Sequence, residues 1–343
     1  MAKILVTGGA GYIGSVITQR LLERGDNSIV LDNLSQGHRG ALPPDAEVIQ
    51  ADLAETLAVE QLFAHHQIEA VVHMAAVSLV GESVRNPVRY YRENVTNLLP
   101  LLEIMALAGC HRMVLSSTAA VYGEPAEVPI SEECATVPVN PYGWTKLMCE
   151  RILTDAAHAP DAGANGPGGA AFHFVSLRYF NVAGATTASG EMHHPETHLI
   201  PRVLEVALGE RPYLELYGDD YPTPDGTCIR DYIHVEDLAE AHVLALDRTR
   251  TASGIYNLGN SRGYSVREVV ECAERVTQKK IPVEKYPRRA GDPPQLVASH
   301  RKASAELGWR PRLSLEEMIR SAWQWRLQHP DGYAPHSRAH AEG

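Results

Sequence analysis

The feature that most constrains this chain is a glycine-rich turn, "VTGGAGYIG", at residues 6–14. It follows an apolar run, "KILV", and opens onto apolar residues at helical spacing. Glycines at such a corner let the backbone approach a pyrophosphate, whose charge then lies at the amino end of the helix. Asp32 ends the next apolar run, where a carboxylate accepts hydrogen bonds from ribose hydroxyls and repels a 2′-phosphate. The pattern predicts that the chain binds NAD rather than NADP.

Short β-branched runs alternate with helical patterns through the first half of the chain. This alternation is typical of βαβ units, so it predicts an α/β fold with a doubly wound parallel sheet of the Rossmann type. We expect strands near residues 3–8, 28–32, 47–52, 70–75, 112–117 and 172–178. Asp52, at the end of the third run, is compatible both with a contact to the adenine ring and with a simple strand-end cap.

The rhythm of the sequence changes after residue 180, where helical patterns near 197–209, 235–248, 265–278 and 314–327 are separated by Pro- and Gly-rich stretches. We therefore predict an NAD-binding domain at 1–180, with a strand returning to it near 254–260, and a smaller α/β substrate lobe at 181–330. The last residues, 331–343, have little apolar content and predict a flexible tail. The Ala-, Gly- and Pro-rich segment 158–172 predicts a mobile surface loop.

Charge and composition exclude several classes of protein. The net charge of -11 argues against a nucleic-acid partner, which needs a basic face. No apolar run reaches the roughly 18 residues that a membrane-spanning helix requires. The five cysteines form no CxxC pair, which suits a reducing compartment and neither a disulfide scaffold nor a zinc site. These observations predict a cytoplasmic protein.

A tyrosine and a lysine lie one helical turn apart in "NPYGWTK", residues 140–146. Asn140 is a good N-cap and Pro141 a good first helical residue, so Tyr142 and Lys146 share one helix face. A phenol has a pKa of about 10, too high for a base near neutral pH. A nearby ammonium, together with the positive charge of an oxidised nicotinamide, would lower that pKa. The pair therefore predicts a proton acceptor for an alcohol undergoing oxidation.

A hydroxyl cluster follows the fifth predicted strand, in "LSSTAAVYG" at residues 115–123. Ligands of open α/β sheets bind beyond the carboxyl ends of the strands. Thr118 is therefore a candidate third member of the site, with its hydroxyl hydrogen-bonded to the phenol and to the substrate oxygen.

Together, TGGAGYIG, the hydroxyl after the fifth strand and Y-x-x-x-K resemble the extended short-chain dehydrogenase/reductase superfamily. Further matches resemble its UDP-glucose 4-epimerase family: "DNLSQGHRG", "VGES", "NPYGWTKLMCE", "RYFNVAGA", "YPTPDGTCIRDYIHVEDLA" and "RRAGDPPQLVAS". The resemblance implies an isomerase that interconverts UDP-glucose and UDP-galactose with NAD, through a 4-keto sugar. It also implies a homodimer, and the patterns at 84–109 and 141–156 carry enough apolar surface to pair between subunits.

The resemblance assigns roles residue by residue. Tyr142 is the catalytic base, Lys146 its partner and a ligand of the NAD ribose, and Thr118 the hydroxyl member. The implied NAD site comprises Gly8, Gly11, Tyr12, Ile13, Gly14, Asp32, Asn33, Asp52, Leu53 and Asn94, besides Lys146. The implied nucleotide-sugar site comprises Asn181, Leu199, Tyr217, Arg230, Arg289, Asp292 and Leu296, besides Thr118 and Tyr142. In it Arg230 and Arg289 clamp the pyrophosphate, Tyr217 lies against the uracil and Asp292 holds the ribose.

Three other functions are compatible with parts of the sequence. An epimerase acting on UDP-N-acetylglucosamine or on a UDP-pentose, such as UDP-arabinose or UDP-xylose, stays open because Leu296 is intermediate in size at a position that gates the sugar pocket. A 4,6-dehydratase or decarboxylase is disfavoured because Ala119 and Ala120, rather than an acidic residue, follow Thr118. A non-catalytic NAD(P) sensor is disfavoured by the intact Tyr–Lys pair. For "HPETH", at residues 194–198, we expect no metal, because the sequence offers no other nearby ligands.

Overall fold

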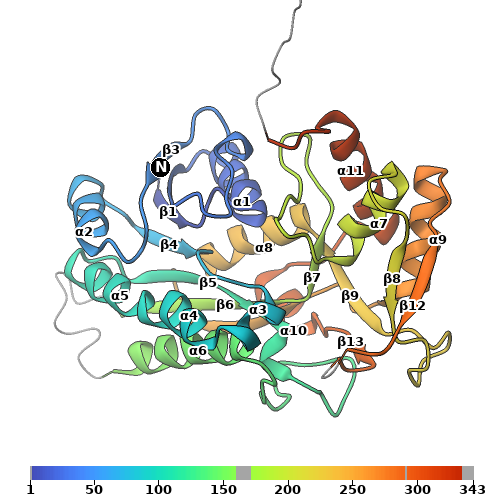
Figure 1. Cartoon of the computed structure of the whole chain (residues 1–343). Helices are drawn as coiled ribbons and strands as arrows, with labels where there is room; N and C mark the ends of the chain where they lie inside the picture. Colours follow the sequence, from blue (N-terminus) through green and yellow to red (C-terminus); the bar gives the residue numbers. More distant parts are fainter. Residues whose placement is uncertain (1, 160–170, 290–291, 334–343) are drawn as a thin grey trace, which may run out of the picture.

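A seven-stranded parallel sheet forms the centre of the molecule (Figure 1). The computed structural model describes residues 2–159, 171–289 and 292–333. The strand order is β10-β6-β5-β4-β1-β2-β3. The bounds are β1 Lys3–Thr7, β2 Asn27–Asp32, β3 Glu47–Gln50, β4 Ala70–His73, β5 Arg112–Thr118, β6 His173–Tyr179 and β10 Gly254–Leu258. All six predicted strands and the returning strand are confirmed, as is the α/β class. Most of the predicted loop 158–172 and tail 331–343 lies outside the described residues.

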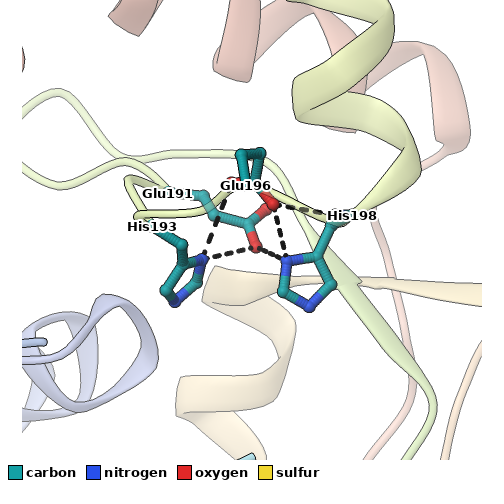
Figure 2. Close-up of side chains that lie close together, drawn as sticks. All are labelled: Glu191, His193, Glu196 and His198. Carbon is teal, nitrogen blue, oxygen red and sulfur yellow. Dashed lines mark hydrogen bonds and ion pairs between the residues drawn. The ribbon is translucent and has the colours of Figure 1, made fainter. Parts of the chain in front are cut away.

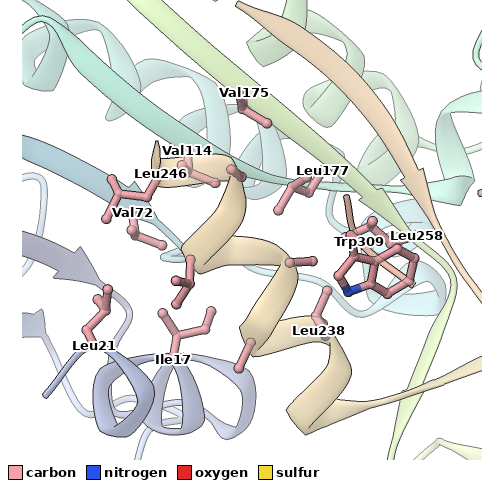
Figure 3. Close-up of a cluster of buried hydrophobic side chains, with 14 of the residues drawn as sticks. Ile17, Leu21, Val72, Val114, Val175, Leu177, Leu238, Leu246, Leu258 and Trp309 are labelled. Carbon is pink, nitrogen blue, oxygen red and sulfur yellow. The ribbon is translucent and has the colours of Figure 1, made fainter. Parts of the chain in front are cut away.

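The sheet is buried on both faces because its strands alternate their side chains between two apolar cores. Ile4 and Val6 face the core that contains α1, Tyr12–Glu23, and α8, Val235–Arg248. Figure 3 shows Ile17 of α1 and Leu238 of α8 in this core. Leu5, between them, faces the core that contains α2 Thr56–His65, α5 Leu98–Leu107 and α6 Pro141–His158. The chain order reverses between β1 and β4, and such a switch point places a ligand site beyond the carboxyl ends of the strands.

A third core lies at one end of the molecule, where α7 Leu199–Leu208, α9 Val266–Thr277 and α11 Leu315–Gln328 gather (Figure 1). The small strands there are β7 Asn181–Ala183, β8 Leu214–Tyr217, β9 Ile229–His234, β11 Gly263–Ser265, β12 Val283–Tyr286 and β13 Gln295–Leu296. The four predicted helices are confirmed. However, α8, α10 (Arg301–Leu307) and β10 pack on the main sheet, because their apolar residues complete its first core. The two predicted parts are therefore interleaved, and their division at residue 180 stays a prediction.

The long helical pattern around residues 84–109 is divided into several segments. It consists of α3 Val80–Arg85, α4 Pro87–Tyr91, a π-helical turn at Arg92–Thr96 and α5. A proline inside a continuous helix kinks it, but Pro100 lies in the first turn of α5, where a missing N–H is tolerated. The irregularity lies upstream, where the Asn97 N–H donates to the Arg92 carbonyl at 3.3 Å, five residues back.

Candidate active site

The glycine turn has the geometry of a phosphate cradle at the start of α1. Gly8 has a φ of +67°, and a Cβ there would lie 2.6 Å from the backbone nitrogen of Ala75. A Cβ on Gly14 would lie 2.3 Å from the Gly8 carbonyl oxygen. Neither position accepts a side chain, so the backbone stays open toward a ligand at the helix N-terminus. The residues present fit a dinucleotide, and Gly11 lies at the N-cap of α1.

Asp32 fixes the turn as well as ending β2. One carboxylate oxygen accepts the Ala10 N–H at 2.9 Å and the other accepts the Leu34 N–H at 2.8 Å. The side chain is almost fully buried. Each oxygen keeps one lone pair that can accept a ribose hydroxyl, so this geometry is compatible with the predicted contact.

The other predicted cofactor residues surround the same turn. Asn33 Nδ2 donates to Asp52 at 2.6 Å, and Asp52 also accepts the Ala54 N–H at 2.8 Å, so Asp52 caps the turn before α2. Its adenine contact stays a prediction. Tyr12 donates to the Gly184 carbonyl at 2.6 Å, which ties α1 to a distant loop. Ile13 and Leu53 are partly buried against the two sheet cores.

Asn94 lies in the π-helical turn, and its side chain is buried. Its amide donates to the Val77 carbonyl at 3.0 Å and to Thr145 Oγ1 at 3.0 Å, while its oxygen accepts the Val77 N–H at 2.9 Å. It therefore joins the segment after β4 to α6, beside Lys146. These contacts give Asn94 a structural role, and its role as an NAD ligand stays a prediction.

The start of α6 brings the phenol to the end of β5. Asn140 Oδ1 accepts the Gly143 N–H at 2.9 Å, which confirms the predicted N-cap. A Cβ on Gly143 would lie 2.5 Å from the Ala120 carbonyl oxygen, so glycine there lets the helix approach the turn after β5 closely. Tyr142 lies near Thr118, whose side chain lowers the pKa of the phenol.

The expected fall in the pKa of Tyr142 depends on an oxidised nicotinamide as well as on Lys146, and it stays a prediction for the enzyme with NAD bound. Burial raises the pKa of the Tyr142 phenol to about 12, and the hydrogen bond with Thr118 offsets that rise only in part. Lys146, expected to lower this pKa, is buried and donates from Nζ to the Ser116 carbonyl at 2.8 Å. A phenolate shielded from water needs a nearby positive charge, and the lysine's charge is here directed to the backbone of β5.

A buried histidine beside this lysine was missed from the sequence. His73, at the end of β4, makes a hydrogen bond of 2.8 Å between Nδ1 and Thr7 Oγ1. Burial, and then the charge of Lys146, lower the pKa of His73 to about 3. The ring is therefore neutral near pH 7, and Lys146 has no second cation beside it. Only its place at a strand end could have suggested this role.

A buried polar network behind α6 was also missed. Arg178 on β6 pairs with Glu150 on α6, with Nε 2.9 Å from one carboxylate oxygen, and both side chains are almost fully buried. Ser117 donates to Glu150 at 2.6 Å, and Arg178 donates to Tyr122 at 2.8 Å. Tyr122 donates in turn to Asn257 at 2.7 Å. The network fixes the strand end that carries Thr118 against the helix that carries Tyr142.

The predicted nucleotide-sugar residues form two contacts around β8 and β9. The Arg289 guanidinium lies 3.9 Å from the ring centroid of Tyr217. Arg230 donates to the Pro293 carbonyl at 2.9 Å and to Asp292 at 3.2 Å. The described structure thus pairs the two predicted arginines with predicted neighbours. One face of Tyr217 is covered by Arg289, and the roles of all four residues in holding a pyrophosphate, uracil and ribose stay predictions.

The remaining predicted substrate residues lie at the edges of the same region. Asn181 donates from Nδ2 to the Asp231 carbonyl at 3.0 Å. Leu199 is the first residue of α7. Leu296 pairs with Arg230 between β13 and β9 and packs against the small core that contains Phe180.

The expectation about "HPETH" was based on a lack of other ligands, and this reasoning is wrong. Four side chains converge before α7, and one ligand atom of each lies within 4.8 Å of the others: Glu191, His193, Glu196 and His198. The proline at 195 does not prevent this, since the loop folds back on itself and places residue 191 beside residue 198.

The fold and the site define a class: an NAD-binding enzyme of the Rossmann type, with a tyrosine and a threonine in contact beyond the sheet. The NAD dependent epimerase/dehydratase family model matches residues 4–259, and the chain belongs to this family. It is 49% identical over 340 residues to the UDP-glucose 4-epimerase of Halalkalibacterium halodurans, covering 98% of each chain.

Solved structures agree with the sequence comparison. A UDP-glucose 4-epimerase crystal structure has a TM-score of 0.91 at 46% identity, over 97% of this chain and 100% of that one. The enzyme of Bifidobacterium longum, solved with NAD+ and UDP, has a TM-score of 0.90 at 38% identity, over 96% and 100%. The chain is an epimerase whose cofactor is NAD, as the sequence predicted.

Proposed function

We propose that this protein interconverts UDP-glucose and UDP-galactose by inverting C4 of the sugar. The observation that carries the proposal is the contact between Tyr142 and Thr118 at the carboxyl end of the sheet, beside the phosphate cradle. Relatives that cover almost the whole chain support it. Bound NAD supplies the acceptor and the donor of the C4 hydride. Tyr142 then takes the proton of the 4-hydroxyl group and returns it as an acid.

The other residues of the site have separate roles in this reaction. Thr118 orients the phenol and stabilises the developing phenolate by a hydrogen bond. Lys146, which donates to the Ser116 carbonyl, would contact the nicotinamide ribose. Arg230, Arg289, Asp292, Tyr217, Asn181 and Leu199 hold the UDP, so that the sugar can present either face to the base while the nucleotide stays bound.

The decisive experiment replaces the phenol oxygen. Tyr142→Phe should lower the turnover of UDP-galactose by at least about a hundredfold, the usual contribution of a general base, while NAD and UDP still bind. Tyr91→Phe on α4 is the matched control and should keep the wild-type rate. A near-normal rate in Tyr142→Phe would refute the assignment of the base.

Substrate breadth is a second proposal, and it rests on Leu296. Its side chain packs beside Phe180, at a position where a small residue would leave more room near C2 of the sugar. We expect Leu296→Tyr to reduce any activity on UDP-N-acetylglucosamine while UDP-galactose turnover persists. The rates of the wild type and of Leu296→Tyr on UDP-galactose, UDP-N-acetylglucosamine and UDP-arabinose test this. Equal rates of wild type and variant on the N-acetylated sugar would show that Leu296 is no gate.

We also propose a homodimer that forms through α3, α4, α5 and α6. Seven large apolar side chains on these helices are exposed: Val80, Val84, Val88, Leu99, Leu107, Trp144 and Met148. Exposed apolar residues gathered on neighbouring helices are typical of a subunit interface. Val88→Glu should shift the sedimentation coefficient to that of a monomer, whereas Leu327→Glu, at an exposed position on α11, should not.

Two further observations support a proposal for where in the cell the protein is found. All five cysteines are free, which suits a reducing compartment. No helix in the described ranges is both long and apolar enough to cross a membrane. The proposed location is the cytoplasm.

A further inference from the structure

Two histidines and two glutamates meet in the loop before α7, away from the catalytic tyrosine. Figure 2 shows the two imidazole rings on either side of the paired carboxylates. His198 Nδ1 lies 2.8 Å from Glu191 and 2.9 Å from Glu196. His193 Nδ1 lies 3.3 Å from Glu191 and 3.7 Å from Glu196. All four ligand atoms therefore surround one point.

The cluster is built into the fold. The carboxylates are almost fully buried, with 8% of Glu191 and 7% of Glu196 exposed. One oxygen of Glu196 accepts the backbone N–H groups of Thr197 and His198, each at 2.7 Å, so the first turn of α7 fixes its orientation. Such supporting hydrogen bonds are typical of ligands that hold a metal ion.

The spacing and the charge both suit one divalent cation. Four ligands at about 2.0–2.1 Å in a tetrahedron lie roughly 3.3–3.5 Å apart, and the observed contacts of 2.8–3.7 Å bracket that range. Two carboxylates with two neutral imidazoles carry a charge that one divalent ion neutralises. His193 Nδ1 faces both carboxylates at 3.3 and 3.7 Å, so once deprotonated it can donate its lone pair to an ion at the same point. The nitrogen and oxygen donors favour Zn²⁺.

The alternative to a bound metal ion is protonation of the two histidines in the cluster. Burial alone lowers the pKa of His193, but hydrogen bonds to Glu191 and Glu196 outweigh it and raise the pKa to about 9. Two protonated histidines would then balance the carboxylates without a metal. A metal ion must displace these protons, so the two states are distinguishable by direct binding.

We propose that Glu191, His193, Glu196 and His198 form a structural Zn²⁺ site. Four protein ligands leave no open position for a reacting water, so the site has a structural rather than a catalytic role. The residues just before the cluster contact the N-terminal part of the chain, since Gly184 accepts from Tyr12 on α1 and Ser189 donates to the Ala41 carbonyl at 2.8 Å. The ion would fix this segment where the cofactor turn meets α7.

An entry path lies beside the cluster. A pocket is lined by the same loop together with Ile200 and Leu204 of α7 and Trp325 of α11. Glu191, His193 and Glu196 line this pocket, so an ion can reach them through it, and His198 is 46% exposed on the surface.

Direct binding tests the proposal on the full-length enzyme after treatment with a chelator and desalting. Calorimetric titration with ZnCl2 should show one ion per chain, and CoCl2 should give the intense visible absorption of a tetrahedral cobalt site. Glu191→Gln and His193→Gln should each weaken Zn²⁺ binding by at least about tenfold. His194→Gln, an exposed neighbour outside the cluster, is the matched control and should bind as wild type does.

Thermal unfolding provides the second readout, since an ion that binds the folded chain raises Tm. ZnCl2 should raise Tm in the wild type and in His194→Gln, but not in the two ligand variants, whose circular dichroism and NAD content should show that they are folded. A wild type that binds no Zn²⁺, or ligand variants that bind it with unchanged affinity, would overturn the proposal and leave the protonated ion-pair cluster.

Discussion

At Tyr142 the protein alone keeps the phenol protonated near neutral pH, because burial raises its pKa to about 12. The hydrogen bond from Thr118 is the described interaction that offsets this rise, and Lys146 donates to a backbone carbonyl instead. In the proposed mechanism the phenol therefore acts as a base only when the positive charge of the oxidised cofactor lowers its pKa. Such a design limits proton abstraction to the loaded enzyme.

Removing the Thr118 hydroxyl should expose this dependence. In Thr118→Val the phenolate loses one hydrogen bond, which is worth about 1.5–3 kcal/mol to a charged group, so kcat should fall by roughly ten- to a hundredfold. The acidic, rising limb of the profile of kcat against pH, which reports the pKa of the base, should also move to higher pH. Thr118→Ser keeps the hydroxyl and should keep both the rate and the profile. An unchanged profile in Thr118→Val would show that Thr118 does not tune the phenol.

The elements of the sheet could be predicted from the sequence because local patterns specify them. The alternation of apolar runs with helical spacing gave all seven strands of the main sheet and four later helices, and Asn140 with Pro141 marked the start of α6. The glycine turn and the Tyr142–Thr118 contact followed from similar local signals.

What could not be predicted depends on contacts between distant segments. Glu150 meets Arg178 across 28 residues, and α8 returns to the first core from the second half of the chain. The π-helical turn at Arg92–Thr96 interrupts the long helical pattern, and apolar periodicity alone does not reveal such a turn. The cluster before α7 was missed because residue 191 lies outside the "HPETH" motif.

The close approach of α6 to the turn after β5 leads to a prediction at the scale of elements. Gly143→Ala adds a Cβ 2.5 Å from the Ala120 carbonyl oxygen, so α6 must shift. We expect a loss of about 1–3 kcal/mol in the free energy of unfolding and a fall in kcat, because Tyr142 moves with the helix. NAD affinity at the glycine turn should change little.

Gly81→Ala is the matched control for this change. A Cβ at Gly81, in α3, meets no atom within 4 Å, and alanine favours a helix over glycine. Urea unfolding and steady-state rates of the two variants provide the comparison. If Gly143→Ala were as stable and as active as Gly81→Ala, the close contact would not constrain the site.

For the whole molecule, three buried neutral histidines make stability depend on pH. Burial lowers the pKa of His73 to about 3 and of His234 and His242 to about 4. The unfolded chain binds a proton on each below pH 6.5, whereas the folded chain does not. Their contribution to stability is therefore complete above pH 6.5 and is lost as the pH falls toward about 4.

Each group contributes up to about 1.4 kcal/mol per pH unit, so the three together give a slope of up to about 4 kcal/mol per unit. Urea unfolding at pH 7, 6 and 5, at constant NAD, measures this slope. His242→Gln should reduce it by about a third. His65→Gln should not, although both rings bond a carbonyl four residues back, because His65 is exposed. Equal slopes in the two variants would contradict the assignment.

The buried ion pair between Glu150 and Arg178 also determines whether α6 can open separately from the rest of the fold. If α6 detached from the sheet alone, the guanidinium of Arg178 would stay in the interior without its counter-charge, at a cost of several kcal/mol. Amide protons in the middle of α6 should therefore exchange with deuterium only through opening of the whole chain. In Glu150→Gln, mass spectrometry should detect faster exchange in α6 than in β1, because the helix can then open separately and take the catalytic tyrosine with it.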